Sequence, residues 1–215
     1  MMDNIDIIRS KQIDDDAREL FNDNGDVLSQ YHVCLKNTNF MSFGGSGLNF
    51  SADMEKDKYA KKPEDVRRTA LIIIPDKALV DDLIAEGFNI RQNKPYPGKE
   101  DEYIPIYYTT IIANYDSKKS KPNIFLSSEN GHVFPGNPST GYVLLDESNV
   151  GNLDGIAVDR VRVCLNKYTN KLGTGKSLYI QTMFVDQAVR NDPIIRRYAP
   201  RQSLSLSPLI RPPLR

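Results

Sequence analysis

The chain has 215 residues, of which 28 are basic and 28 acidic, so its formal net charge at pH 7 is zero. This length fits one domain of the larger all-β or α+β kind, with additional segments at its ends. No apolar run approaches the ~20 residues of a membrane helix, and the acidic start lacks the basic and apolar regions of an export signal.

The charged residues are distributed unevenly along the chain. Residues 1–26 hold eight acidic and three basic side chains, a balance of −5. From Arg190 onward there are six arginines against one aspartate, a balance of +5, together with five prolines. Such segments bury too little apolar surface to fold alone. We therefore predict an acidic N-terminal segment (1–26), one folded domain (27–189) and a basic, proline-rich, extended tail (190–215), with flexible termini.

Hydrophobic periodicity and turn signals divide the chain into many short elements. The pattern predicts helices over residues 14–21 and 77–86, the second ended by Gly87, and a helical turn over 146–153. It predicts strands over 30–36, 69–74, 88–91, 103–115, 123–126, 141–145 and 157–165. Short strands with two small helices favour a mainly β fold, a closed or partly closed barrel, over a βαβ fold.

No metal site or catalytic group is predicted. His32 and Cys34 are two residues apart, but zinc needs about four such ligands and no second pair exists. Asp146 and Glu147 are better explained as residues of a helix start, and no nucleophile, base and orienting group can be placed together. We expect no enzyme activity and no cofactor. Cys34 and the distant Cys164 are predicted to be reduced, buried thiols of an intracellular protein.

The segment "NKLGTGKSLYIQTMFV" contains Gly-Thr-Gly-Lys-Ser, which resembles a phosphate-binding loop. The first glycine of that motif is replaced by Asn170, and the residues after Ser177 have the β-branched, aromatic pattern of a strand, not of a helix. The pattern instead predicts a hairpin, with a strand from Arg160 to Leu165, a cationic turn and a return strand from Ser177.

Basic and aromatic residues alternate around this hairpin. Lys167, Tyr168, Lys171 and Lys176 lie in the turn region, and Tyr179 begins the return strand. The same pattern continues elsewhere with Arg91, Tyr107, Tyr108, Arg160 and Arg162. Cations that follow phosphates and rings that stack bases are what single-stranded nucleic acid requires. The alternative is that the tyrosines close the ends of a barrel and the lysines only solvate turns.

Five segments together resemble the single-stranded DNA-binding proteins of tailed bacteriophages. They are "ALIIIPDKALVDDLIAEGFNIRQNKP", "PIYYTTIIANY", "PNIFLSS", "LLDESNVGNLDG" and "VDRVRVCLNKYTNKLGTGKSLYIQTMFV". The resemblance covers about residues 50–185 and implies an oligonucleotide-binding (OB) barrel with inserted short helices. Similar proteins have an Arg-Pro pair and a tryptophan before the hairpin turn, where this chain has Leu165 to Tyr168 and no tryptophan. Its basic end also departs from the acidic tail common in replication-type single-strand binders.

We therefore expect a protein that coats and protects single-stranded DNA without sequence specificity, during phage replication or recombination in the cytoplasm of the infected host cell. Tyr107, Tyr108, Tyr168 and Tyr179 are the stacking candidates, and Arg91, Arg160, Arg162, Lys167, Lys171 and Lys176 the phosphate candidates. Self-association through the tails and phage replication proteins are the expected further partners. Two alternatives stay open: a phage structural or assembly protein whose tails link subunits, and a nucleotide-dependent enzyme.

Overall fold

The computed structural model describes residues 26–41, 47–57, 59–95, 97–115, 121–127 and 142–188. The predicted helix over 14–21 and both terminal segments lie outside these residues. The strands are β1 (Val27–Leu28), β2 (His32–Thr38), β3 (Leu48–Asn49), β4 (Arg68–Ile74), β5 (Arg91–Gln92), β6 (Tyr107–Ala113), β7 (Asn123–Ser127), β8 (Tyr142–Leu145), β9 (Val158–Thr169) and β10 (Lys176–Gln187). The helices are α2 (Lys77–Ala85) and the short 3-10 helices η1 (Met54–Lys56), η2 (Pro63–Asp65), η3 (Glu100–Glu102) and η4 (Val150–Gly155).

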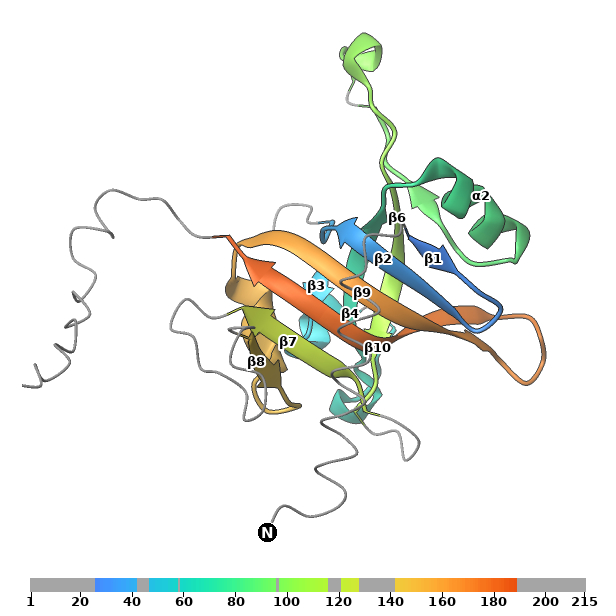
Figure 1. The fold of residues 1–215 in the computed structure, drawn as a ribbon. Helices are drawn as coiled ribbons and strands as arrows, with labels where there is room; N and C mark the ends of the chain where they lie inside the picture. Colours follow the sequence, from blue (N-terminus) through green and yellow to red (C-terminus); the bar gives the residue numbers. More distant parts are fainter. Residues whose placement is uncertain are drawn as a thin grey trace, which may run out of the picture.

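All ten strands form one mixed sheet, in the order β1-β2-β9-β10-β6-β4-β3 (Figure 1). β5 pairs with β6, while β7 pairs with β10 and β8. The antiparallel hairpin of β9 and β10, which the sequence predicts, lies at the centre of the sheet. α2 and the connection between β5 and β6 lie at one end of the molecule, and β7 and β8 at the other (Figure 1).

β10 changes its partner halfway along one edge. Its first half pairs in parallel with β6, through Leu178 with Ile111, and its second half pairs in parallel with β7, through Thr182 to Val185. The register against β9 shifts between Ile180 and Thr182, at the change of partner. Because a β-bulge bends its strand and increases the twist, it helps the sheet to curl at this point.

The two ends of this curled sheet approach each other without closing. After β2, Phe40 forms an isolated bridge with Ile72 of β4, and the amides of Met41 and Ile73 donate across the same gap. The mainly β class predicted from the sequence is confirmed. A closed barrel is not, because this contact is one bridge and not a continuous ladder.

α2 forms where the sequence predicts it. The Asp76 carboxylate accepts a hydrogen bond from the Ala78 amide at 2.8 Å, which caps the first turn. Leu79, Val80 and Leu83 are buried in the main core, so this face of the helix covers the sheet. No helix among the described residues is long and apolar enough to cross a membrane.

The prediction of two reduced cysteines is wrong, because Cys34 and Cys164 form a disulfide. They are direct partners in the antiparallel pairing of β2 with β9, and their Cα atoms are 4.0 Å apart. Their separation of 130 positions in the sequence hid this proximity. A cross-link over so long a separation stabilises the fold by about 2 to 5 kcal/mol, mainly by restricting the unfolded chain.

Candidate nucleic-acid interface

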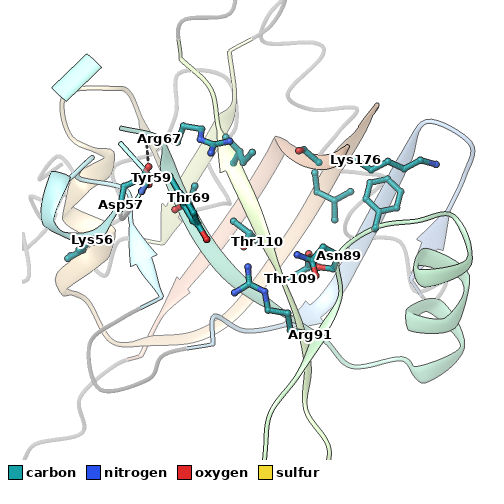
Figure 2. A pocket seen from close by; sticks show the side chains of 14 residues that line it. Lys56, Asp57, Tyr59, Arg67, Thr69, Asn89, Arg91, Thr109, Thr110 and Lys176 are labelled. Atoms are coloured by element: carbon teal, nitrogen blue, oxygen red, sulfur yellow. Dashed lines mark hydrogen bonds between the residues drawn. The ribbon is translucent and has the colours of Figure 1, made fainter. Parts of the chain in front are cut away.

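A groove of about 620 Å³ crosses β4, β6 and the start of β10 (Figure 2). Its floor consists mostly of short or apolar side chains. They are Thr69 of β4, Thr109, Thr110 and Ile112 of β6, and Ser177 and Leu178 of β10. A flexible polymer can therefore lie across the strands without meeting a large side chain on the floor.

One wall comes from the connection between β3 and β4, which carries Lys56, Asp57, Tyr59 and Arg67. Tyr59 is 86% exposed, so its ring is presented to solvent. The Asp57 carboxylate accepts from the backbone amides of Tyr59 at 3.1 Å and Arg67 at 3.3 Å, which holds the two flanks of this wall together. The hydrogen bond from the Tyr59 amide also lowers the pKa of Asp57, so this carboxyl group is ionised at neutral pH.

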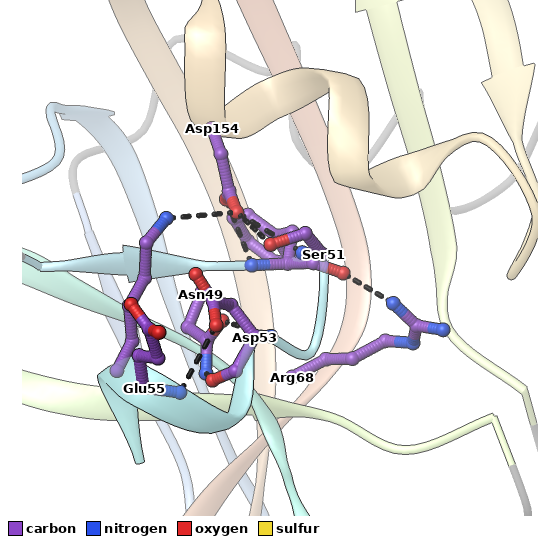
Figure 3. Close-up of polar contacts among 8 residues, drawn as sticks. Asn49, Ser51, Asp53, Glu55, Arg68 and Asp154 are labelled. Atoms are coloured by element: carbon purple, nitrogen blue, oxygen red, sulfur yellow. Dashed lines mark hydrogen bonds and ion pairs between the residues drawn. The ribbon is translucent and has the colours of Figure 1, made fainter. Parts of the chain in front are cut away.

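A polar network fixes the base of this wall (Figure 3). The Asp154 carboxylate at η4 accepts from the amides of Phe50 and Ser51 at 2.8 and 3.0 Å, and from the Ser51 hydroxyl at 2.6 Å. Lys56 lies 3.5 Å from the same carboxylate. Asp154 therefore anchors the segment that leads into the wall, although 103 to 104 positions of sequence separate it from Ser51 and Phe50.

The opposite wall comes from the residues after α2, namely Phe88, Asn89 and Arg91, with Lys176 at the start of β10 (Figure 2). Four cationic side chains, Lys56, Arg67, Arg91 and Lys176, thus line the groove with the carboxylate of Asp57, and Lys56, 37% exposed, also forms the 3.5 Å ion pair with Asp154. Cations facing one another across an open channel attract a polyanion and follow its phosphates.

A pair of tyrosines extends the same face of the sheet beyond the groove. The rings of Tyr168 and Tyr179 contact edge to face, with centroids 5.6 Å apart. Tyr179 is the register partner of Ile112, and Tyr168 that of Ser177, and both partners line the groove. Paired residues share a face of a sheet, so the tyrosine pair lies on the groove's face. Tyr168 is 49% exposed and can accept a stacked base.

The two other tyrosine candidates lie on β6. Tyr108 alternates with Thr110 and Ile112 and is paired with Arg91, so it shares the groove's face. Tyr107 points the other way, where it packs against the main core with the Lys77 ammonium 5.4 Å from its ring centroid.

Three predicted phosphate residues are engaged by carboxylates in the structure. Arg160 and Arg162 both bind Asp186, with N···O distances of 2.8 and 3.2 Å, and Arg162 is buried beside the Tyr142 ring. The Lys167 ammonium binds Glu86 at 2.7 Å. Of the predicted phosphate residues, Arg91 and Lys176 line the groove, and Lys171 is exposed in the hairpin turn.

The network around Asp186 is a stabilising feature of the far end of the sheet. Burial acts to raise the pKa of Asp186, but hydrogen bonds from Tyr142 and Arg160 and the charges of both arginines outweigh it and leave that pKa lowered. Burial, followed by the hydrogen bond to Asp186, raises the pKa of Tyr142 to about 12. The Asp186 carboxylate is thus ionised and paired in the folded protein. Its contribution to the free energy of unfolding is fully present above the pKa that Asp186 has in the unfolded chain. This contribution is lost as the pH falls through the lower pKa that Asp186 has in the folded protein.

Sequence reasoning missed Lys56, Tyr59, Arg67 and Phe88. A signal for the first three was present, since "KDKYAKK" interleaves an aromatic residue with cations, as the hairpin does. The sequence alone predicts no site there, because nothing in it places this segment opposite Lys176.

The Gly-Thr-Gly-Lys-Ser motif spans the end of the predicted hairpin turn and the first two residues of β10. The Asn170 side chain accepts from the Thr174 amide at 2.9 Å and so shapes a hairpin turn. A phosphate-binding loop would have to open a helix, so the motif is not one. Within the described part of the chain, no three His, Cys, Asp or Glu side chains are grouped to hold a metal.

The structure is a mainly β domain with a basic groove and exposed aromatic residues on one face of its sheet. Residues 48–204 match the family model described as "Putative phage ssDNA-binding domain", and the chain belongs to this family of phage single-stranded DNA-binding proteins, which are not enzymes. No curated protein and no solved structure matches the chain.

Proposed function

We propose that this protein coats single-stranded DNA through the groove and the adjoining tyrosine pair. The observation that carries the proposal is the convergence of four cations with Tyr59, on the face that also bears Tyr168 and Tyr179. The strand crosses β4, β6, β10 and β9 in turn, with phosphates on the cations and bases on the rings.

We further propose that β2, β4, β6, β10 and β9 form an OB-type barrel of the partly open kind. In such barrels, oligonucleotides bind the face of the second and third strands, between the loop joining the first two strands and the loop joining the last two. In this chain, those strands are β4 and β6, and those loops carry the Lys56 to Arg67 wall and the hairpin turn. The groove therefore lies where this architecture binds its ligands.

Binding without sequence preference follows from the chemistry of the groove. Phosphates and aromatic base faces are common to all sequences, and the hydroxyl groups on the floor are too short to form the two-point contacts that identify a base. Together with the family, this supports protection of DNA strands during phage replication or recombination, in the cytoplasm of the infected cell. Phage replication proteins are natural partners for such a role.

We also keep the proposal that the basic tail supports self-association. Its charge of +5 complements the −5 of the N-terminal segment, and Leu204, Leu206, Leu209 and Ile210 provide apolar contacts that phosphates do not require. Binding of the tail directly to DNA is the alternative that the same charge allows.

Fluorescence anisotropy with labelled single-stranded oligonucleotides of graded length tests the function. Affinity is expected to rise with length up to a site of about 4 to 16 nucleotides, to fall steeply with salt, and to vary little between mixed sequences. Unlabelled duplex of equal length should compete weakly. Absence of binding at low salt would favour a structural or assembly protein instead, and equal competition by duplex would refute a single-strand binder.

A further inference from the structure

The wall of the groove after α2 is organised around Phe88, which two lysines flank. The Lys167 and Lys176 ammonium nitrogens lie 5.9 and 5.5 Å from the centroid of its ring. Sequence reasoning treated both lysines as phosphate ligands of one cationic turn. Their surroundings in the structure are different.

Lys167 uses all of its donor capacity within the protein. Its ammonium donates to the Ser29 carbonyl at 2.7 Å and to the two Glu86 carboxylate oxygens at 2.7 and 2.8 Å. Its side chain is 5% exposed. An ammonium has three protons, so this geometry leaves none for a phosphate. Lys176, in contrast, makes no ion pair with any described residue and lines the groove.

The partners of Lys167 belong to different elements. Ser29 lies in the turn between β1 and β2, while Glu86 ends α2. Lys167 itself is on β9, so one ammonium joins the helix end to the central hairpin. We call these three residues the clamp.

The turn after Glu86 connects the clamp to the groove. Gly87 has φ +91°, a conformation that favours glycine, and the Phe88 amide then donates to the Leu83 carbonyl at 2.9 Å. A Cβ on Gly87 would lie 3.9 Å from the Lys176 Cε, so the stem of Lys176 passes over this turn. The turn therefore positions Phe88 and contacts the side-chain stem of Lys176.

We propose that Lys167 is a positioning residue, whose clamp on Glu86 and Ser29 fixes the turn after α2, with Phe88 buried beneath it, and so aligns Asn89, Arg91 and Lys176 along the bound strand. Lys176 makes the phosphate contact that the sequence assigned to both lysines. This inference rests on the proposed function, because it assumes that the groove holds DNA.

The test compares two variants with the same loss of charge, Lys167→Gln and Lys176→Gln, in the full-length protein, with a mixed-sequence oligonucleotide across a salt series. Lys176→Gln is expected to flatten the slope of log affinity against log salt by about 0.7, the contribution of one phosphate on a single strand. Lys167→Gln should leave the slope unchanged and weaken binding about tenfold in parallel at every salt concentration. It should also lower the melting temperature.

Glu86→Gln is the second variant, and it removes a negative charge close to the groove. The clamp predicts that this change also weakens binding, whereas simple electrostatics predicts that it tightens binding. A flattened slope for Lys167→Gln, combined with tighter binding for Glu86→Gln, would overturn the inference and make Lys167 a direct phosphate ligand. If the wild-type protein binds no oligonucleotide, the proposed function fails. The melting temperatures of the two clamp variants still show whether the contacts of Lys167 with Glu86 and Ser29 stabilise the fold.

Discussion

A variant with glutamine at all four cationic positions of the groove is expected to lose most of its salt-dependent affinity for single-stranded DNA. The substitutions are Lys56→Gln, Arg67→Gln, Arg91→Gln and Lys176→Gln. Each phosphate contact contributes about 0.7 to the slope of log affinity against log salt, so removing four flattens the slope by up to about 3, with the smallest share from Lys56, which pairs with Asp154. When the salt concentration rises fourfold, the affinity of the wild-type protein should therefore fall up to about 50-fold further than the affinity of the variant.

The matched control changes the overall charge equally at exposed lysines that lie outside the groove and its walls. These are Lys77, Lys94, Lys99 and Lys121. Glutamine at these four positions should leave the slope close to that of the wild-type protein, because distant exposed charges are screened at physiological salt. Equal slopes for the groove variant and the control would mean that the groove does not hold the phosphates.

Replacing both Tyr168 and Tyr179 by leucine is expected to produce the second large loss. Leucine keeps apolar bulk but has no aromatic face, and a stacked base contributes about 1 to 3 kcal/mol. Because the two rings contact each other, their effects should not simply add. Titrations with short oligonucleotides should show the loss for all sequences alike, at an unchanged salt slope.

Tyr107→Leu is the matched control for the tyrosine pair. Its ring lies on the other face of β6, against the main core. This substitution should lower the melting temperature and leave affinity nearly unchanged. If the pair variant instead loses stability without losing affinity, Tyr168 and Tyr179 contribute only to packing.

Periodicity and turn chemistry revealed the local structure of this chain well. The Asp76 cap and the apolar spacing of Leu79 and Leu83 predict α2, and the two runs around the Asn170 to Gly175 turn predict the central hairpin. β6 begins at Tyr107 and not at Tyr103, because Pro105 interrupts the run and the Ile106 amide donates to the Asn93 side chain at 2.7 Å.

Contacts between distant segments could not be predicted in the same way. Cys34 and Cys164 meet only because β2 pairs with β9, and no local pattern specifies that pairing. The groove has the same origin, since Arg67 and Lys176 are more than a hundred residues apart in the sequence yet line one channel. Composition indicated the right chemistry, a mixture of cations and aromatic rings, but not which of these residues share a face.

Ion pairs within the protein explain why some lysines and arginines predicted to bind phosphate are poor phosphate ligands in the structure. Lys167 and Arg162 look like phosphate ligands in the sequence, but Glu86 and Asp186 neutralise them in the structure. A lysine or arginine on a strand is therefore a ligand candidate only after its carboxylate partners are known, and these partners lie on other elements.

Ultraviolet cross-linking to single-stranded DNA carrying 5-bromodeoxyuridine, followed by peptide mapping, tests the location of the interface most directly. The account predicts cross-links to the peptides that contain Tyr59, Tyr168 and Tyr179, the aromatic residues that the groove wall and the adjoining face present to a bound strand. Cross-links confined to the exposed connection around η3, or to the two terminal segments, would contradict it.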